Sequence, residues 1–209
     1  MNKILNWFIK SILAGMFIGI GCLAYLSSPD KIVGAFLFTV GLFVILTFKL
    51  NLFTGKICYV IEKKNYLEVV ITLLGNFIGT LLLALMCRAT RLINLIEYAN
   101  AICEIKLSDS YISLFILGIL CNILIYIAVE GYNKFKDIRG ILSLFFGVII
   151  FVVIGLEHCI ADMFYFNFTF IYSWEVLLRL LIIVLGNGIG GISIRYLFRR
   201  RNEIFKGRD

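Results

Sequence analysis

Long apolar stretches separated by short polar connections account for most of this chain. Four of them are uninterrupted, at about residues 9–26, 67–86, 110–129 and 174–198. Each is close to the roughly 20 residues that a helix needs to cross the hydrocarbon core of a bilayer. The pattern therefore predicts four straight membrane-spanning helices, with residues 87–109 as a connection.

Two further apolar stretches are interrupted near their middles. One covers 32–48, meets the polar run 49–56 and resumes over 57–61. The other covers 141–166 and contains Gly155 followed by ionisable residues. An apolar run that breaks and resumes is typical of a discontinuous membrane helix, whose unwound backbone can line a cavity. Spans two and five are therefore predicted to be broken helices.

The two halves of the chain share a glycine-asparagine motif. Gly75-Asn76-Phe77-Ile78-Gly79 lies in the third span, and Gly186-Asn187-Gly188-Ile189-Gly190 lies in the sixth. Together with the two broken spans, the motif predicts an all-α membrane protein of six transmembrane helices, arranged as two inverted three-helix repeats with a site near the bilayer midplane. The expected single transmembrane domain covers 1–209, with repeat one at about 1–90, repeat two at about 106–200 and a basic cytoplasmic tail at 199–209.

Composition supports membrane insertion. Of the 209 residues, 61% are hydrophobic and 16% are charged, where soluble domains carry about 25% charged residues. The formal net charge of +7 invites a nucleic-acid interpretation, but many of the basic residues cluster directly after the last apolar stretch. Basic residues in that position are typical of the cytoplasmic flank of a membrane helix. Nucleic acid is therefore not an expected partner; the lipid bilayer is.

The distribution of lysine and arginine predicts the orientation. If the N-terminus is inside, the outer ends of the spans carry only Lys31, Arg88, Arg91 and Lys106, and the other basic flanks are cytoplasmic. Cytoplasmic connections carry an excess of basic residues. An integral protein of the cytoplasmic membrane with both termini on the cytoplasmic side is expected.

His158 is the only histidine in the chain, and it lies beside Glu157 in the fifth span. An ionisable side chain at membrane depth costs roughly 2.5–3.5 kcal/mol on insertion scales and usually faces a cavity, a pathway or a partner. We expect His158 to face a pathway for a small solute; the alternative is a histidine that packs between helices. One histidine cannot form a multi-histidine metal centre, and no hydrolase motif is present. No metal, cofactor or enzymatic activity is expected.

Three sequence blocks resemble the formate/nitrite transporter family. They are Leu52-Phe53-Thr54-Gly55 after the first break, Gly118 to Asn122 (GILCN) in span four and Gly155 to Phe164 (GLEHCIADMF) in span five. The resemblance implies pentamers of six-helix protomers with an aquaporin-like fold. It also implies a pore in each protomer for small monovalent anions such as formate, nitrite or hydrosulfide.

The resemblance implies roles for individual residues. His158 and Thr54 correspond to the pore centre, Asn122 to a pore-lining asparagine and Lys106 to a vestibule lysine that attracts anions. The cytoplasmic constriction would be formed by Phe38, Leu42 and Phe151, and the outer constriction by Leu52 and Ile125. From the residues alone, Thr54 could instead cap the following half-helix, Asn122 could pack between spans and the three residues of the cytoplasmic constriction could be ordinary packing.

Three positions depart from the family pattern. Lys49 replaces a small residue, Asn51 an acidic one and Asp162 an asparagine. A lone intramembrane charge requires a partner, so a charge pair between Lys49 and Asp162 is one hypothesis. Glu157 is expected to brace the broken segment by accepting backbone donors. Because of these departures, a hydrosulfide channel remains an alternative to a formate or nitrite channel.

The expected function is a channel or secondary transporter for small monovalent weak-acid anions. The anion would enter the Lys106 vestibule, lose water at the constrictions and be neutralised with the aid of His158, which can donate a hydrogen bond or a proton. The alternatives are a hydrosulfide channel and an aquaporin-type pore for neutral solutes. The second lacks the asparagine-proline-alanine boxes of aquaporins, because Pro29 is the only proline.

Overall fold

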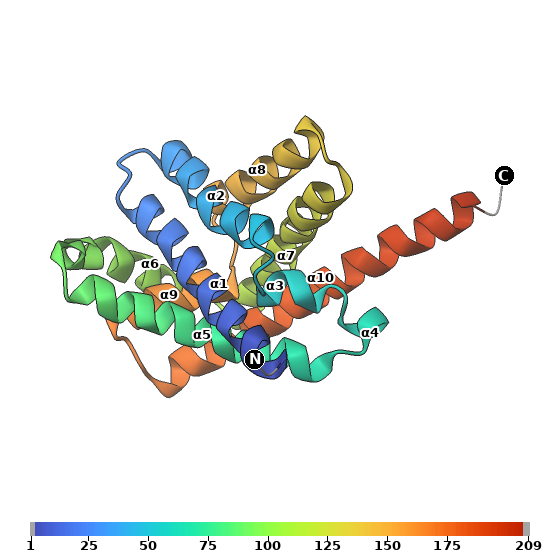
Figure 1. Ribbon diagram of the computed structural model, residues 1–209. Coiled ribbons are helices and arrows are strands. Elements are labelled where there is room, and N and C mark those ends of the chain that lie inside the picture. Colours follow the sequence, from blue (N-terminus) through green and yellow to red (C-terminus); the bar gives the residue numbers. More distant parts are fainter. Residues whose placement is uncertain (1–2, 207–209) are drawn as a thin grey trace.

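The structure, a computed structural model, describes residues 3–206, and over 201–206 it describes the backbone alone. Within this range every regular element is a helix (Figure 1). In chain order they are α1 (Lys3–Leu26), α2 (Lys31–Thr47), α3 (Phe53–Ile57), α4 (Val60–Lys63), α5 (Tyr66–Arg88), the 3₁₀ helix η1 (Arg91–Leu95), α6 (Ile96–Ser108), α7 (Tyr111–Lys134), α8 (Ile138–Val153), α9 (Cys159–Thr169) and α10 (Trp174–Lys206).

The predicted spans are recovered with small shifts of their ends. Among the described helices, α1, α5, α7 and α10 are long and apolar enough to cross a membrane. Two shorter apolar helices, α2 and α8, occupy the interrupted stretches. Each is followed by a break and then by a half-helix, α3 or α9. The breaks expected in the second and fifth spans are therefore present.

Both breaks use the same backbone geometry. After α2, Lys49 has a φ of 52° and the N–H of Leu50 donates to the carbonyl of Ile45 at 2.9 Å. After α8, Gly155 has a φ of 74° and the N–H of Leu156 donates to the carbonyl of Phe151 at 2.9 Å. A left-handed residue followed by this six-to-one hydrogen bond is the Schellman motif, which ends a helix.

The long helices of each half pack backbone against backbone. Helix α1 lies along α5, and α7 lies along α10. A Cβ atom on Gly79 would stand 2.0 Å from the carbonyl oxygen of Ile12, and one on Gly190 would stand 2.3 Å from that of Ile119. Only glycine fits either contact, which accounts for the last glycine of each glycine-asparagine motif.

Two boundaries differ from the prediction. The connection at 87–109 is not irregular but folds as η1 and α6, in which Ala99 and Cys103 form a buried stripe against α9 while the flanking Glu97 and Glu104 stay exposed. The sixth span, at Trp174–Arg200, lies close to its predicted bounds, but its helix α10 continues past it to Lys206 and extends beyond the other helices (Figure 1). Much of the expected basic tail is therefore helical, and its residues 207–209 lie outside the described range.

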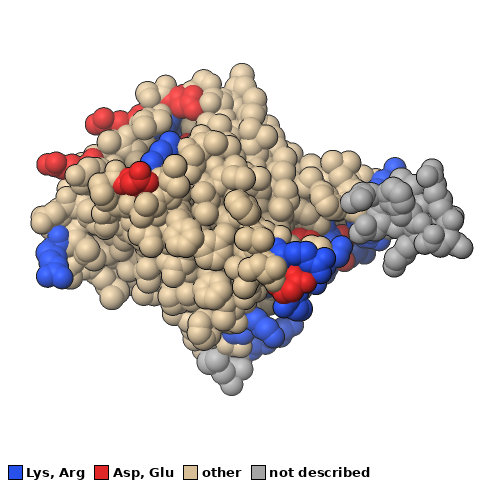
Figure 2. Space-filling view, turned by 90° about the horizontal axis from the view of Figure 1, so that it is seen from above, with Lys and Arg blue, Asp and Glu red and all other residues tan. Residues whose placement is uncertain are grey.

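Charged side chains gather at two ends of the molecule, with a broad surface of uncharged residues between them (Figure 2). Near the C-terminal end of α10, Arg195 pairs with Glu62 of α4 at 2.9 Å and with Glu130 of α7 at 3.2 Å. The hydrogen bonds from Arg195 lower the pKa of the Glu62 carboxyl below its ordinary value. These ion pairs tie the short helix α4 to two of the long helices.

Replacing Lys49 by glycine is expected to stabilise the protein by about 1 kcal/mol, because a side chain in the left-handed region costs roughly 1–2 kcal/mol that glycine avoids. Thermal unfolding in detergent, followed by tryptophan fluorescence, measures the change. Lys136→Gly is the matched control, since Lys136 is an exposed connecting lysine without a positive φ. If Lys49→Gly were no more stable than this control, the backbone at Lys49 would not be strained.

Candidate functional site

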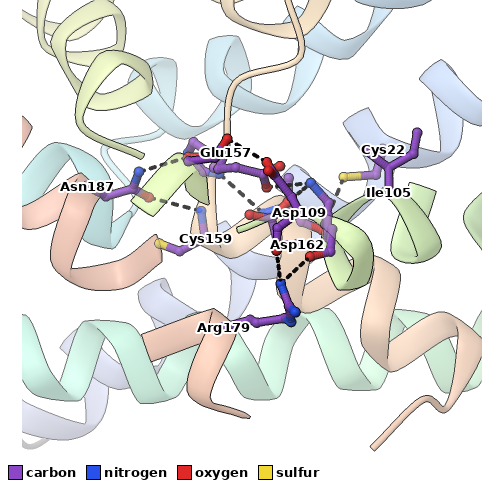
Figure 3. A network of polar contacts seen from close by, with 12 residues as sticks. Cys22, Ile105, Asp109, Glu157, Cys159, Asp162, Arg179 and Asn187 are labelled. Carbon is purple, nitrogen blue, oxygen red and sulfur yellow. Dashed lines mark hydrogen bonds and ion pairs between the residues drawn. The ribbon is translucent and has the colours of Figure 1, made fainter. Parts of the chain in front are cut away.

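Asn187 holds the second break together. From α10, its Nδ2 donates to the carbonyls of Gly118 at 2.8 Å and Glu157 at 2.9 Å, while its Oδ1 accepts from the N–H of Cys159 at 2.9 Å (Figure 3). The side chain is fully buried. One amide therefore satisfies peptide groups on both sides of His158 and fixes the start of α9.

Asn76 does the same at the first break. From α5, its Nδ2 donates to the carbonyls of Ser11 at 2.7 Å and Asn51 at 2.9 Å, and its Oδ1 accepts from the N–H of Phe53 at 2.8 Å. These contacts fix the start of α3. Sequence reasoning used the glycine-asparagine motifs as evidence of a repeat and missed this capping role. The signal was the asparagine itself, a polar residue at the same place in both motifs.

The two breaks meet through Thr54 and His158. The Thr54 Oγ1 lies 3.1 Å from the Nε2 of His158, and both side chains are buried. The Nδ1 of His158 accepts from the N–H of Ala161 at 3.2 Å and so caps α9. In the neutral ring the proton therefore belongs on Nε2, which donates to Thr54. The hydroxyl hydrogen of Thr54 is then available to a solute.

These contacts bear on two alternatives that the sequence left open. Thr54 is not the cap of α3, because Leu52 occupies the N-cap position and the N–H of Phe53 donates to the Oδ1 of Asn76. Asn122 is fully buried on α7 and donates to the carbonyls of Thr54 at 3.2 Å and Asn187 at 2.7 Å. It therefore positions the two breaks relative to one another through their backbones.

A cavity opens on each side of the Thr54–His158 pair. One, of about 190 Å³, is lined by Phe38, Phe151, Lys106, His158 and Asp162, among others. The second, of about 500 Å³, is lined by residues that include Leu42, Leu52, Gly55 and three lysines, Lys49, Lys56 and Lys63. The pair thus lies between two cavities, and each cavity has an apolar wall.

The predicted grouping of the constrictions is corrected by this arrangement. Phe38 and Phe151 lie together, with ring centroids 5.7 Å apart, on the side of Lys106. Leu42 lines the opposite cavity with Leu52, because four residues along α2 advance the chain by about 6 Å. The apolar residues therefore form a phenylalanine pair on one side and a leucine pair on the other. Ile125 is fully buried on α7.

Lys106 forms a buried ion cluster. Its Nζ lies 2.5 Å from the Oε2 of Glu157 and 2.9 Å from the Oδ1 of Asp162. The predicted pair between Lys49 and Asp162 is not present, because Lys106 takes Asp162 while Lys49 lines the opposite cavity. Glu157 also differs from its expected bracing role. Its carboxylate pairs with Lys106 and, among the described residues, does not accept backbone donors, whereas its backbone carbonyl accepts a hydrogen bond from Asn187.

Arg179 fixes the end of the helix that carries Lys106. Its guanidinium donates to the carbonyls of Lys106 at 2.9 Å and Asp109 at 2.6 Å and pairs with Glu175 (Figure 3). It therefore caps the C-terminus of α6, where a cation is favoured. This role is hard to predict from sequence, because an arginine near the end of a span is normally taken for an interfacial anchor.

Comparison with known proteins identifies the family. The sequence profile described as "Formate/nitrite transporter" matches residues 1–199. The chain belongs to the formate/nitrite transporter family. The resemblance seen in the three sequence blocks is thereby confirmed, and the chain is an integral membrane protein of a family of channels and transporters.

Relatives match over most of this chain. The formate-nitrite transporter of Plasmodium falciparum is 30% identical over 232 residues, covering 91% of this chain and 75% of that protein. The formate channel FocA of Escherichia coli strain K12 is 28% identical over 192 residues, covering 77% and 65%. A solved structure described as a pentameric formate channel with formate bound has a TM-score of 0.82 at 24% identity and covers 96% of this chain and 98% of its own. That likeness concerns the fold.

Asn187→Ala is expected to destabilise the protein by about 3 kcal/mol, because three buried peptide groups lose their partner and each unsatisfied group costs about 1–3 kcal/mol. Thermal unfolding in detergent measures the loss. The control is Asn133→Ala, an exposed asparagine for which a change within about 0.5 kcal/mol is expected. If the two variants unfolded at the same temperature, the bridging role of Asn187 would be refuted.

Lys106→Met is expected to destabilise the protein by about 3–5 kcal/mol, because it leaves two buried carboxylates without their cation. Combining it with Glu157→Gln and Asp162→Asn should recover most of the loss. Unfolding midpoints in detergent compare the variants. Lys31→Met serves as the control, since Lys31 lines the same cavity but is exposed. If Lys106→Met is no more destabilised than the control, or if the triple variant recovers none of the lost stability, Lys106 does not balance the charge of the two carboxylates.

Proposed function

We propose that the protein conducts small monovalent weak-acid anions, formate or nitrite among them, through a pore in each protomer. The hydrogen bond between Thr54 and His158, at the point where two broken helices meet between two cavities, carries this proposal. The pair offers a solute one buried hydroxyl and one imidazole. The path would run from one cavity past this pair into the other.

The apolar walls explain why a weak acid is the expected solute. Phe38 and Phe151 on one side and Leu42 and Leu52 on the other offer no hydrogen bonds to replace water. A desolvated anion in such surroundings is far more costly than its neutral, protonated form. A solute that can take up a proton, or share one strongly with His158, crosses with a lower barrier. Phe151 stacks on the His158 ring at 5.7 Å, which holds the imidazole in place.

The proposed architecture of the protein is based on the two similar helix breaks. Two inverted three-helix repeats would place Asn76 and Asn187, the Schellman motifs and the half-helices α3 and α9 in equivalent positions about the midplane. Both termini would be cytoplasmic, which puts the cavity with the three lysines on the cytoplasmic side and the phenylalanine pair outside. The pentameric state named for the similar solved structure is proposed for this chain as well.

Flux into proteoliposomes tests the proposal. Formate, nitrite and hydrosulfide are supplied in turn at two pH values, and glycerol serves as the neutral-solute probe. We expect anion flux above that of protein-free liposomes, higher at the lower pH, with the fastest anion identifying the preferred substrate. In His158→Phe the anion flux should fall at least about tenfold, which corresponds to a rise of about 1.4 kcal/mol in the barrier to transport.

Matched threonine variants separate chemistry from folding. Thr54→Val removes the hydroxyl that bonds His158, whereas Thr47→Val removes an exposed hydroxyl at the end of α2. Only the first should lower flux. Flux of glycerol without anion flux would favour the aquaporin-type alternative. Anion flux that is unchanged in both His158→Phe and Thr54→Val would exclude the proposed pore centre.

A further inference from the structure

The larger of the two cavities beside the pore centre is lined by three lysines. Lys49 belongs to the first break, Lys56 to α3 and Lys63 to α4. Among the residues whose side chains the structure describes, none of the three forms an ion pair. The ammonium of Lys56 lies 4.9 Å from the ring centroid of Trp7, and that of Lys63 lies 5.2 Å from the ring centroid of Tyr59. Aromatic faces attract these ammonium groups but do not neutralise them.

The carboxylates near this cavity are engaged by other residues. Glu130 is the one carboxylate among the described residues that line it, and it pairs with Arg195 at 3.2 Å. Glu68, which attracts Lys56 from α5, pairs with Lys3 at 3.7 Å. Clustered like charges raise the local potential, and a cavity with low-dielectric walls focuses it. The cavity therefore has a positive charge that the described carboxylates do not balance.

The rest of the cavity wall is largely apolar. The apolar side chains that line it are Leu42, Ile45, Leu46, Leu50, Leu52 and Val129. Its volume of about 500 Å³ lies within the usual range for small-molecule sites, about 300–1,000 Å³. A lysine ammonium is a compact point charge, whereas arginine favours planar, two-point pairing. A ligand with two carboxylates joined by a short hydrocarbon chain therefore matches this cavity in both charge and apolar surface.

We propose that this cavity binds small dicarboxylate anions, which close the pathway to the conducted monovalent anion while they occupy it. The inference rests on the proposed transport function and goes beyond it, because the dicarboxylate is bound but not conducted. A monovalent anion leaves most of the lysine charge unbalanced, whereas a dianion pairs with two lysines at once. The site thus makes flux depend on the concentration of dicarboxylate at this mouth.

The leucine pair explains why a bound dicarboxylate does not pass. Leu42 and Leu52 line the cavity, and they are 2% and 3% exposed. Their side chains offer no hydrogen bonds to replace the water that two carboxylates would lose, and removing a charge from water without such replacement is very costly. Uptake of one proton still leaves a dicarboxylate charged. It therefore stays in the cavity between the lysines and the leucine pair, where it obstructs a smaller anion.

Tryptophan fluorescence of the purified protein in detergent measures binding. Trp7 contacts Lys56, and Trp174→Phe removes the second of the two tryptophans, so that Trp7 is the only reporter. Succinate is titrated at pH 7.5, where both of its carboxyl groups are ionised, and sodium chloride keeps the ionic strength constant. We expect a saturable change, with a dissociation constant at least about threefold lower for succinate than for acetate because of the second ion pair.

Matched lysine variants locate the site. In Lys49→Gln/Lys63→Gln the dissociation constant of succinate should rise at least about threefold, because two exposed ion pairs are lost. Lys64→Gln is the control, since Lys64 is exposed and adjacent to Lys63 but does not line the cavity. Sulfate is the control ligand, because it is divalent but has no hydrocarbon chain. Equal dissociation constants for the double variant and the control, or for succinate and sulfate, would overturn the inference.

Flux into proteoliposomes measures the block. With succinate on both sides at ten times its dissociation constant, wild-type formate flux should fall to about a tenth. At the same concentration the double variant should be inhibited less, and Lys64→Gln should be inhibited as the wild type is. Succinate itself should enter no faster than it enters protein-free liposomes.

The outcomes separate the two proposals. Formate flux that succinate does not inhibit, or succinate uptake through the protein, would overturn the inference while the transport function stands. Absence of flux for every anion would overturn the proposed transport function, whereas the fluorescence titration would still show whether the cavity binds a dicarboxylate.

Discussion

A bilayer supplies no water to a peptide group, so a helix that breaks inside it needs partners from the protein for every freed N–H and carbonyl. Asn76 and Asn187 meet this requirement here, each with one side-chain amide that bridges a break. Because the breaks are held in this way, α3 and α9 begin at defined residues and bring Thr54 within hydrogen-bond distance of His158. The cavities and the apolar pairs are arranged around that contact.

The sequence predicted the helices well because its apolar runs have the length that a membrane requires. It located both breaks, and it singled out His158 and Asp162, because ionisable residues within such runs are conspicuous. Thr54 was singled out only by the resemblance to the family. It could not group Phe38, Leu42 and Phe151 correctly, since one helical turn moves a side chain from one side of the pore centre to the other. The helix at 96–108 was hidden by its charged, exposed face.

The partner of a buried charge was the hardest feature to predict. Lys49 and Asp162 both depart from the family pattern, which suggested that they compensate each other. In the fold they are unrelated: Lys49 occupies the left-handed position that Gly155 has in the other half, and Asp162 joins Lys106 and Glu157. Pairing depends on distances between α6 and α9, which have no counterpart in sequence spacing.

In the proposed pathway a solute passes the Nε2–H of His158 and the hydroxyl of Thr54. Because His158 is the only histidine, nitrogen NMR of ¹⁵N-histidine-labelled protein purified without a histidine tag reports this ring alone. We expect a neutral ring with its proton on Nε2, and an Nε2 resonance that shifts when formate, nitrite or hydrosulfide is added. A proton on Nδ1, or a resonance that responds to none of these anions, would contradict it.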